Sequence, residues 1–250
     1  MTNVFIFLDN SNIFLSGRSI AELRDGIGAK GPFRLQLDNL IELAAAGRTI
    51  GGAWASGSTD SDRSSPIWKT LRDRGVRVEV YERGAYTGGE QAVDQSLQVH
   101  LLRLGYQDPQ VAVLLTGDGS GHEGGTGFLN DAKLLASNGW AVEVLSWRHS
   151  CSAALRAWAE EHGVFVPLDD YYDQVTFLEF ERLSRPLILT KRSRAVPGKS
   201  LRERVEEEVT RAAAAKVALL NDQLDELRRK VSRTERYNAR MARRNAPGTR

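Results

Sequence analysis

Two aspartates follow short apolar runs that have the composition of buried strands. Asp9 comes directly after Val4–Leu8, and Asp118 follows Val111–Thr116. A third carboxylate, Asp94, lies in the first turn of a predicted helix. In an open parallel sheet, chemistry gathers beyond the carboxyl ends of the strands. We therefore expect the three aspartates to converge at that edge.

Carboxylates that converge at one edge repel each other unless a cation neutralises them. The chain offers hard oxygen ligands there, whereas it has a single cysteine, Cys151, and no histidine pair at helical spacing. Such ligands suit Mg²⁺ or Mn²⁺. Any one aspartate after a strand could instead be only a helix cap or a turn former. The metal prediction therefore depends on the convergence of all three.

The elements that must position these residues are visible as alternating strand and helix patterns. Segments of helical periodicity separate the apolar runs, and several end in turn signals such as Asn138-Gly139. Near-continuous apolar strands that alternate with helices are typical of a parallel sheet covered on both faces. The sequence thus predicts a doubly wound α/β fold of five or six strands. The predicted strands are Val4–Leu8, Ile50–Ser56, Val76–Tyr81, Val111–Thr116, Ala141–Ser146 and Val164–Pro167.

The strand and helix pattern fades after residue 178. We predict a globular domain over residues 1–182, a linker over 183–199, a long amphipathic helix over 200–244 and a disordered tail over 245–250.

The predicted long helix carries an apolar seam. Its members alternate spacings of three and four residues, which permits a coiled coil and a homodimer. A solvated helix that packs back on the domain explains the seam equally well. The seam residues are Val217, Leu220, Leu224, Leu227 and Val231.

Charge is unevenly distributed along the chain. The net charge is +2, but residues 226–250 hold nine basic and two acidic residues, so the other residues sum to −5. A basic end and an acidic body point to a polyanionic partner, first of all nucleic acid. The side chains that would bind the phosphates of the nucleic acid include Arg192, Arg228 and Arg229. A solvated, disordered end is the alternative.

Several classes of protein are disfavoured. The longest uninterrupted aliphatic run, Val111–Leu115, is far shorter than the roughly 20 residues that cross a bilayer. The first apolar run has no basic region before it and ends at Asp9, unlike a secretory signal. One cysteine excludes an internal disulfide. We expect a cytoplasmic protein without a membrane span.

Three blocks carry a family resemblance. They are Val4–Asn12, Val93-Asp94 and Leu114–Gly119, and they resemble the signature blocks of the NYN domain, a PIN-like nuclease fold, over about residues 3–180. The resemblance implies a metal-dependent nuclease, foremost a ribonuclease, that hydrolyses phosphodiester bonds in RNA or single-stranded DNA. By the same resemblance Asp9, Asp94 and Asp118 would hold the Mg²⁺ or Mn²⁺, with Asn12 as a polar helper.

The chain departs from that family in its third block. NYN domains usually carry a second aspartate where this chain has Ser120, and a glycine-rich loop follows. Glu123 or Asp131 could supply the missing carboxylate as a metal ligand. Without one, the chain would be an RNA-binding or scaffold protein with a weak or inactive site. A nuclease that acts on one particular RNA is a third possibility. Further candidate substrate contacts near the same edge are Ser11, Asn12, Thr116, Ser120 and His149.

Overall fold

The structure is a computed structural model that describes residues 2–59, 66–82, 89–118 and 127–244. Within these ranges, the side chains of residues 59, 82, 89–94 and 242–244 are not described. The chain divides into two compact units, residues 1–200 and residues 201–250, and each is described by itself.

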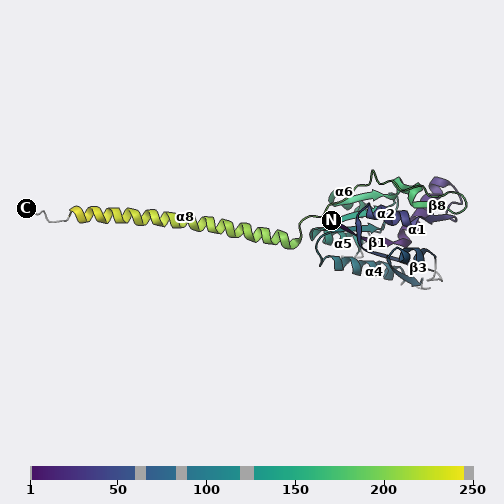
Figure 1. The fold of residues 1–250 in the computed structure, drawn as a ribbon, viewed down its shortest axis with the longest axis horizontal. Coiled ribbons are helices and arrows are strands. Elements are labelled where there is room, and N and C mark those ends of the chain that lie inside the picture. The colour runs from purple at the N-terminus through teal and green to yellow at the C-terminus, as the bar shows by residue number, and fades with distance from the viewer. Residues whose placement is uncertain (1, 60–65, 83–88, 119–126, 245–250) are drawn as a thin grey trace, which may run out of the picture. The chain divides into compact units, whose positions relative to one another are not determined.

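Unit 1 is built on a six-stranded sheet with helices around it (Figure 1). Every neighbouring pair of strands is parallel. The predicted doubly wound α/β fold is therefore confirmed, and each predicted strand is present within three residues of its expected bounds. In spatial order the strands are β4 (Arg77–Glu82), β3 (Thr49–Thr59), β1 (Asn3–Asp9), β5 (Val111–Leu115), β6 (Ala141–Ser146) and β7 (Val164–Pro167).

Two groups of helices pack against opposite sides of the sheet. Side chains alternate along each strand, so Leu8 of β1 joins one core while its neighbour Phe7 joins the other. Because β1 leads into a helix of the first group and β5 into a helix of the second, the winding reverses between these two adjacent strands. The first group is α1 (Asn10–Asp25), α2 (Leu37–Ala45) and α3 (Pro66–Asp73), and the second is α4 (Gly89–Leu104), α5 (Phe128–Ser137) and α6 (Ala153–His162).

A small antiparallel sheet, which the sequence did not predict, joins two distant parts of the chain. Strand β2 (Phe33–Leu35) pairs with β8 (Thr176–Leu178). A 3-10 turn, η1 (Leu168–Tyr171), and the short helix α7 (Tyr172–Val175) lead from β7 into β8. Strands of three residues are too short for their alternation to be recognised in a sequence.

Residues 183–199 are part of unit 1, and the prediction of a linker there is wrong. Leu187, Leu189 and Ala195 pack against the first core. The side chain of Arg192 is fully buried in an ion pair with Glu143 of β6. These contacts bind the segment to the domain, and the compact unit ends at residue 200 rather than 182.

Unit 2 contains one long helix, α8 (Leu201–Arg244). Taken by itself, this helix leaves the predicted seam, Leu224 among its residues, exposed. The predicted disordered tail, 245–250, lies outside the described residues. Over the part of the chain that the structure describes, no helix is long and apolar enough to cross a membrane.

Candidate functional site

The carboxyl ends of β1 and β5 meet where the winding of the sheet reverses. Ligands of open α/β sheets bind at such a point. Asp9 ends β1 and caps α1, while residues 116–118 directly follow β5. Leu8 lies opposite Leu115 in the parallel register, so the two strand ends are level. The structure thus brings the Asp9 and Asp118 segments to one edge of the sheet.

Four hydrogen bonds hold these two segments, and two of them, from Thr116 to Asp9 and from Gly117 to Asn12, cross from one segment to the other. The Asp9 carboxylate accepts from the Asn12 backbone N–H at 3.0 Å and from the Thr116 hydroxyl at 3.4 Å. The same hydroxyl accepts from the Asp118 N–H at 3.1 Å. The Asn12 side-chain oxygen accepts from the Gly117 N–H at 2.7 Å. Asn12 and Thr116, predicted as substrate contacts, therefore hold the strand ends in place.

Gly117 allows this close approach. A methyl group at position 117 would lie 3.0 Å from the Asn12 side-chain oxygen, the Ser146 hydroxyl and the Ser150 carbonyl. The Gly117 carbonyl accepts from the Ser152 N–H at 2.8 Å, and Ser152 caps α6. The loop after β5 is therefore fixed between the first turns of α1 and α6, and a larger residue would push them apart.

A row of polar residues crosses three strands at this end of the sheet. Asp9 is 4% exposed, and it lies opposite Ser56 of β3, which lies opposite Glu79 of β4. The Ser56 hydroxyl is buried and has no hydrogen-bond partner among the described residues. Hydrogen bonds from Ser96 and His100 of α4 lower the pKa of Glu79. Sequence reasoning missed this row, although Glu79 lies within a predicted strand and could have been noticed.

Asp94 lies in the second turn of α4 and not in the first, because the helix already begins at Gly89. Its side chain is not described, and the predicted contributions of Ser120 and Glu123 fall outside the described residues. Asp131 is 8% exposed on α5, and burial raises its pKa to about 6. Among described side chains, no three His, Cys, Asp or Glu residues form a group that could hold a metal ion. Asp131 therefore does not join Asp9 and Asp118 in a described metal cluster.

The remaining predicted contacts lie elsewhere or have other partners. The Ser11 hydroxyl accepts from the Ser58 N–H at 3.0 Å, which ties α1 to the end of β3. His149 is exposed in the turn after β6. The prediction that Arg192 contacts phosphate is contradicted, because its buried guanidinium donates to Glu143 at 2.6 Å. Arg228 and Arg229 lie on α8 and are exposed.

The family model of the NYN domain matches residues 3–165. The chain belongs to the NYN domain family. That family is PIN-like and generally nuclease-like, so the edge between β1 and β5 lies in a domain related to nucleases. Comparisons with curated proteins and with solved structures gave no significant match.

The donors of this NYN domain fit the type of ion that its fold implies. The described groups at the edge are the carboxylates of Asp9 and Asp118, the hydroxyl of Thr116 and the amide of Asn12. All of these oxygens are hard donors, which Mg²⁺ and Mn²⁺ prefer over softer ligands.

Proposed function

We propose that the chain is a metal-dependent ribonuclease that hydrolyses phosphodiester bonds at the edge between β1 and β5. The observation that carries the proposal is the hydrogen-bonded network that fixes the Asp9 carboxylate beside the Asp118 segment. It lies at the reversal of the sheet, where an α/β fold binds its ligand, in a domain of a nuclease-like family.

The protein's own residues have distinct roles in this proposal. Asp9, Asp94 and Asp118 would hold Mg²⁺ or Mn²⁺, which supplies a reactive water at neutral pH and neutralises charge on the phosphate. Asn12 and Thr116 keep the Asp9 carboxylate in one orientation. Asp118 is less buried than Asp9, and we assign to it the proton released by the attacking water.

Helix α8 contributes to substrate binding and assembly in the same proposal. Exposed arginines, Arg228 and Arg229 among them, would contact the phosphates of RNA regardless of sequence. Its apolar seam, which includes Leu220 and Leu224, would pair with the seam of a second copy. Two basic helix ends in one dimer would hold one RNA strand more tightly than a single end.

The substitution Asp118→Asn tests the assignment. We expect it to abolish Mn²⁺-dependent cleavage of single-stranded RNA while RNA binding persists, because the asparagine amide has the shape of the aspartate carboxylate but not its charge. Asp108→Asn, at an exposed loop residue before β5, is the matched control and should cut normally.

Cleavage that survives Asp118→Asn, or that persists in EDTA, would overturn the proposed mechanism. If the parent protein binds RNA but cuts none with either metal, the chain is a binding or scaffold protein with a nuclease-like domain.

A further inference from the structure

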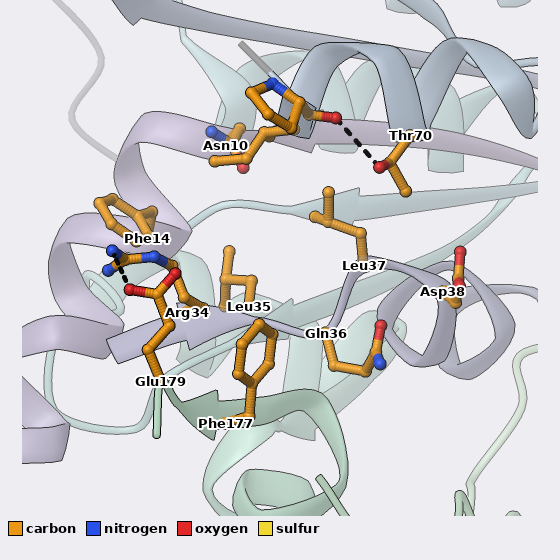
Figure 2. A pocket seen from close by; sticks show the side chains of 12 residues that line it. Asn10, Phe14, Arg34, Leu35, Gln36, Leu37, Asp38, Thr70, Phe177 and Glu179 are labelled. Atoms are coloured by element: carbon orange, nitrogen blue, oxygen red, sulfur yellow. Dashed lines mark hydrogen bonds and ion pairs between the residues drawn. The ribbon is translucent and has the colours of Figure 1, made fainter. Parts of the chain in front are cut away.

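A groove opens beside the proposed catalytic edge, on the side of the sheet that α1, α2 and α3 cover (Figure 2). Its volume is about 570 Å³, which is within the range of roughly 300–1,000 Å³ for sites that hold small ligands. The lining comes from distant parts of unit 1, including α1, the β2–β8 sheet and the start of α3.

Asn10 connects the groove to the catalytic edge. It follows Asp9 directly, begins α1 and lines the groove. Only 8% of Asn10 is exposed, and its side-chain amide has no hydrogen-bond partner among the described residues. The described buried polar atoms that lack a partner do not include this amide, so solvent reaches it at the groove and it can hydrogen-bond to a ligand there.

The charges of the groove do not suit a phosphate. Among the described lining residues, the one basic side chain is that of Arg34. It pairs with Glu179 at 2.6 Å and donates to the Gly31 and Phe33 carbonyls at 2.8 and 2.7 Å. The carboxylate of Asp38 also lines the groove. Both carboxylates are paired, Glu179 with Arg34 and Asp38 with Arg74 at 2.9 Å, so among the described lining residues an anionic ligand would find no uncommitted cation, whereas a neutral ligand needs none.

The other lining groups suit a flat molecule with polar edges. Two aromatic rings line the groove, Phe14 from α1 and Phe177 from β8, and the Arg34–Glu179 ion pair lies between them in the view of Figure 2. The Gln36 side-chain amide, like that of Asn10, has no partner among the described residues. Aromatic faces stack on nucleobases, and amide side chains offer a donor and an acceptor to a base edge.

We propose that this groove binds one unpaired base of the substrate strand, next to the phosphate at Asp9. The inference rests on the proposed ribonuclease function and extends it. A base inside a duplex is stacked and paired, so it cannot enter a groove between helices. The groove therefore makes the protein selective for single-stranded RNA.

The test measures binding of a fluorescent single-stranded octanucleotide and its duplex form to the full chain, in EDTA so that no cleavage occurs. Phe177→Leu removes the ring and keeps an apolar side chain, and we expect it to weaken single-strand binding at least about fivefold. Gln36→Ala removes only an amide. We expect it to make the affinities for four oligomers, each built from one of the four bases, more alike than they are for the parent. Tyr106→Leu, at an aromatic residue that is 94% exposed after α4, is the matched control and should bind as the parent does.

A second measurement locates the base without substitutions. An oligomer that carries 4-thiouridine is irradiated on the parent protein, and the cross-linked peptide is identified by mass spectrometry. We expect peptides that contain Phe14 or Phe177. Melting temperatures of all variants separate loss of binding from loss of folding, and Gln36→Ala tests the groove even if Phe177→Leu unfolds.

The outcomes separate the groove from the catalytic proposal. If the parent cleaves RNA but Phe177→Leu and Gln36→Ala bind like the parent, or if Tyr106→Leu weakens binding equally, the groove proposal is wrong and the nuclease stands. If the variants weaken binding and the cross-link maps to the groove while the parent never cleaves, the groove is supported and the nuclease is refuted. A parent that binds no RNA refutes both.

Discussion

Arg192 offers the sharpest test of how the domain is held together. Its buried side chain donates to the Glu143 carboxylate at 2.6 Å and to the Leu43 carbonyl at 3.0 Å. Arg192→Met keeps an apolar side chain of similar length and removes the charge and the donors. If Arg192 is structural, the variant loses stability, and if it contacts phosphate, the variant loses RNA affinity.

The size of the effect follows from the partners that remain. Removal of one partner from a buried ion pair costs about 3–5 kcal/mol, because the other charge stays buried. Arg48 still donates to both Glu143 oxygens at 2.8 Å, and the Ala195 N–H donates at 2.8 Å. We therefore expect the lower end, about 3 kcal/mol. For a domain of this size, that lowers the melting temperature by about 6–12 °C.

The stability that Arg192→Met loses should depend on pH. Burial raises the pKa of Glu143, but hydrogen bonds from Arg48 and the charge of Arg192 outweigh burial, so the pKa is lowered. A carboxyl with a lowered folded-state pKa contributes stability above its unfolded pKa, and that contribution is lost as the pH falls through the folded pKa. The unfolding free energies of the parent and of Arg192→Met should therefore differ by the full amount at neutral pH and converge below about pH 4.

Urea denaturation followed by circular dichroism measures the change in the free energy of unfolding, and the fluorescence anisotropy of a labelled RNA measures binding. Arg194→Met, two residues away and exposed, is the control and should leave stability unchanged. A variant at position 192 that is as stable as the parent but binds RNA more weakly would refute the structural role.

Three further predictions concern other parts of the chain. Asp131→Asn should raise the free energy of unfolding near pH 8 by up to about 3 kcal/mol and leave it almost unchanged near pH 3. Burial raises the Asp131 pKa to about 6, so the charged form is disfavoured in the folded protein. Thermal melts across this pH range measure the change. Leu220→Asp should dissociate the proposed dimer in sedimentation experiments, whereas Leu219→Asp, at an adjacent exposed leucine outside the seam, should not. Replacement of Arg228 and Arg229 by serine should reduce the slope of log affinity against log salt by about 1.4 for single-stranded RNA, and an unchanged slope would exclude both from phosphate contact.

The strands of the central sheet could be predicted because they are buried on both sides and read as apolar runs. The β2–β8 sheet could not, since each strand has three residues and 140 residues separate Leu35 from Thr176, its partner in the register. The segment 183–199 was mistaken for a linker because its prolines and basic residues have linker composition. Glu143 within the apolar strand 141–146 could have pointed to a buried cation partner, a signal that the sequence analysis did not use, but the sequence does not say which arginine fills that role.

Position along a strand, and not burial or residue type, separates the candidate site from the other buried carboxylates. Glu143 lies in the middle of β6, opposite Val113 of β5, and its two arginine partners make it structural. Asp131 lies on a helix, and burial without such partners shifts its pKa in the opposite direction. Asp9 alone of these three ends a strand at the reversal of the sheet, a position that the sequence already indicates. Which partner neutralises a buried carboxylate depends on contacts between distant segments, so only the folded chain distinguishes Glu143 from Asp131.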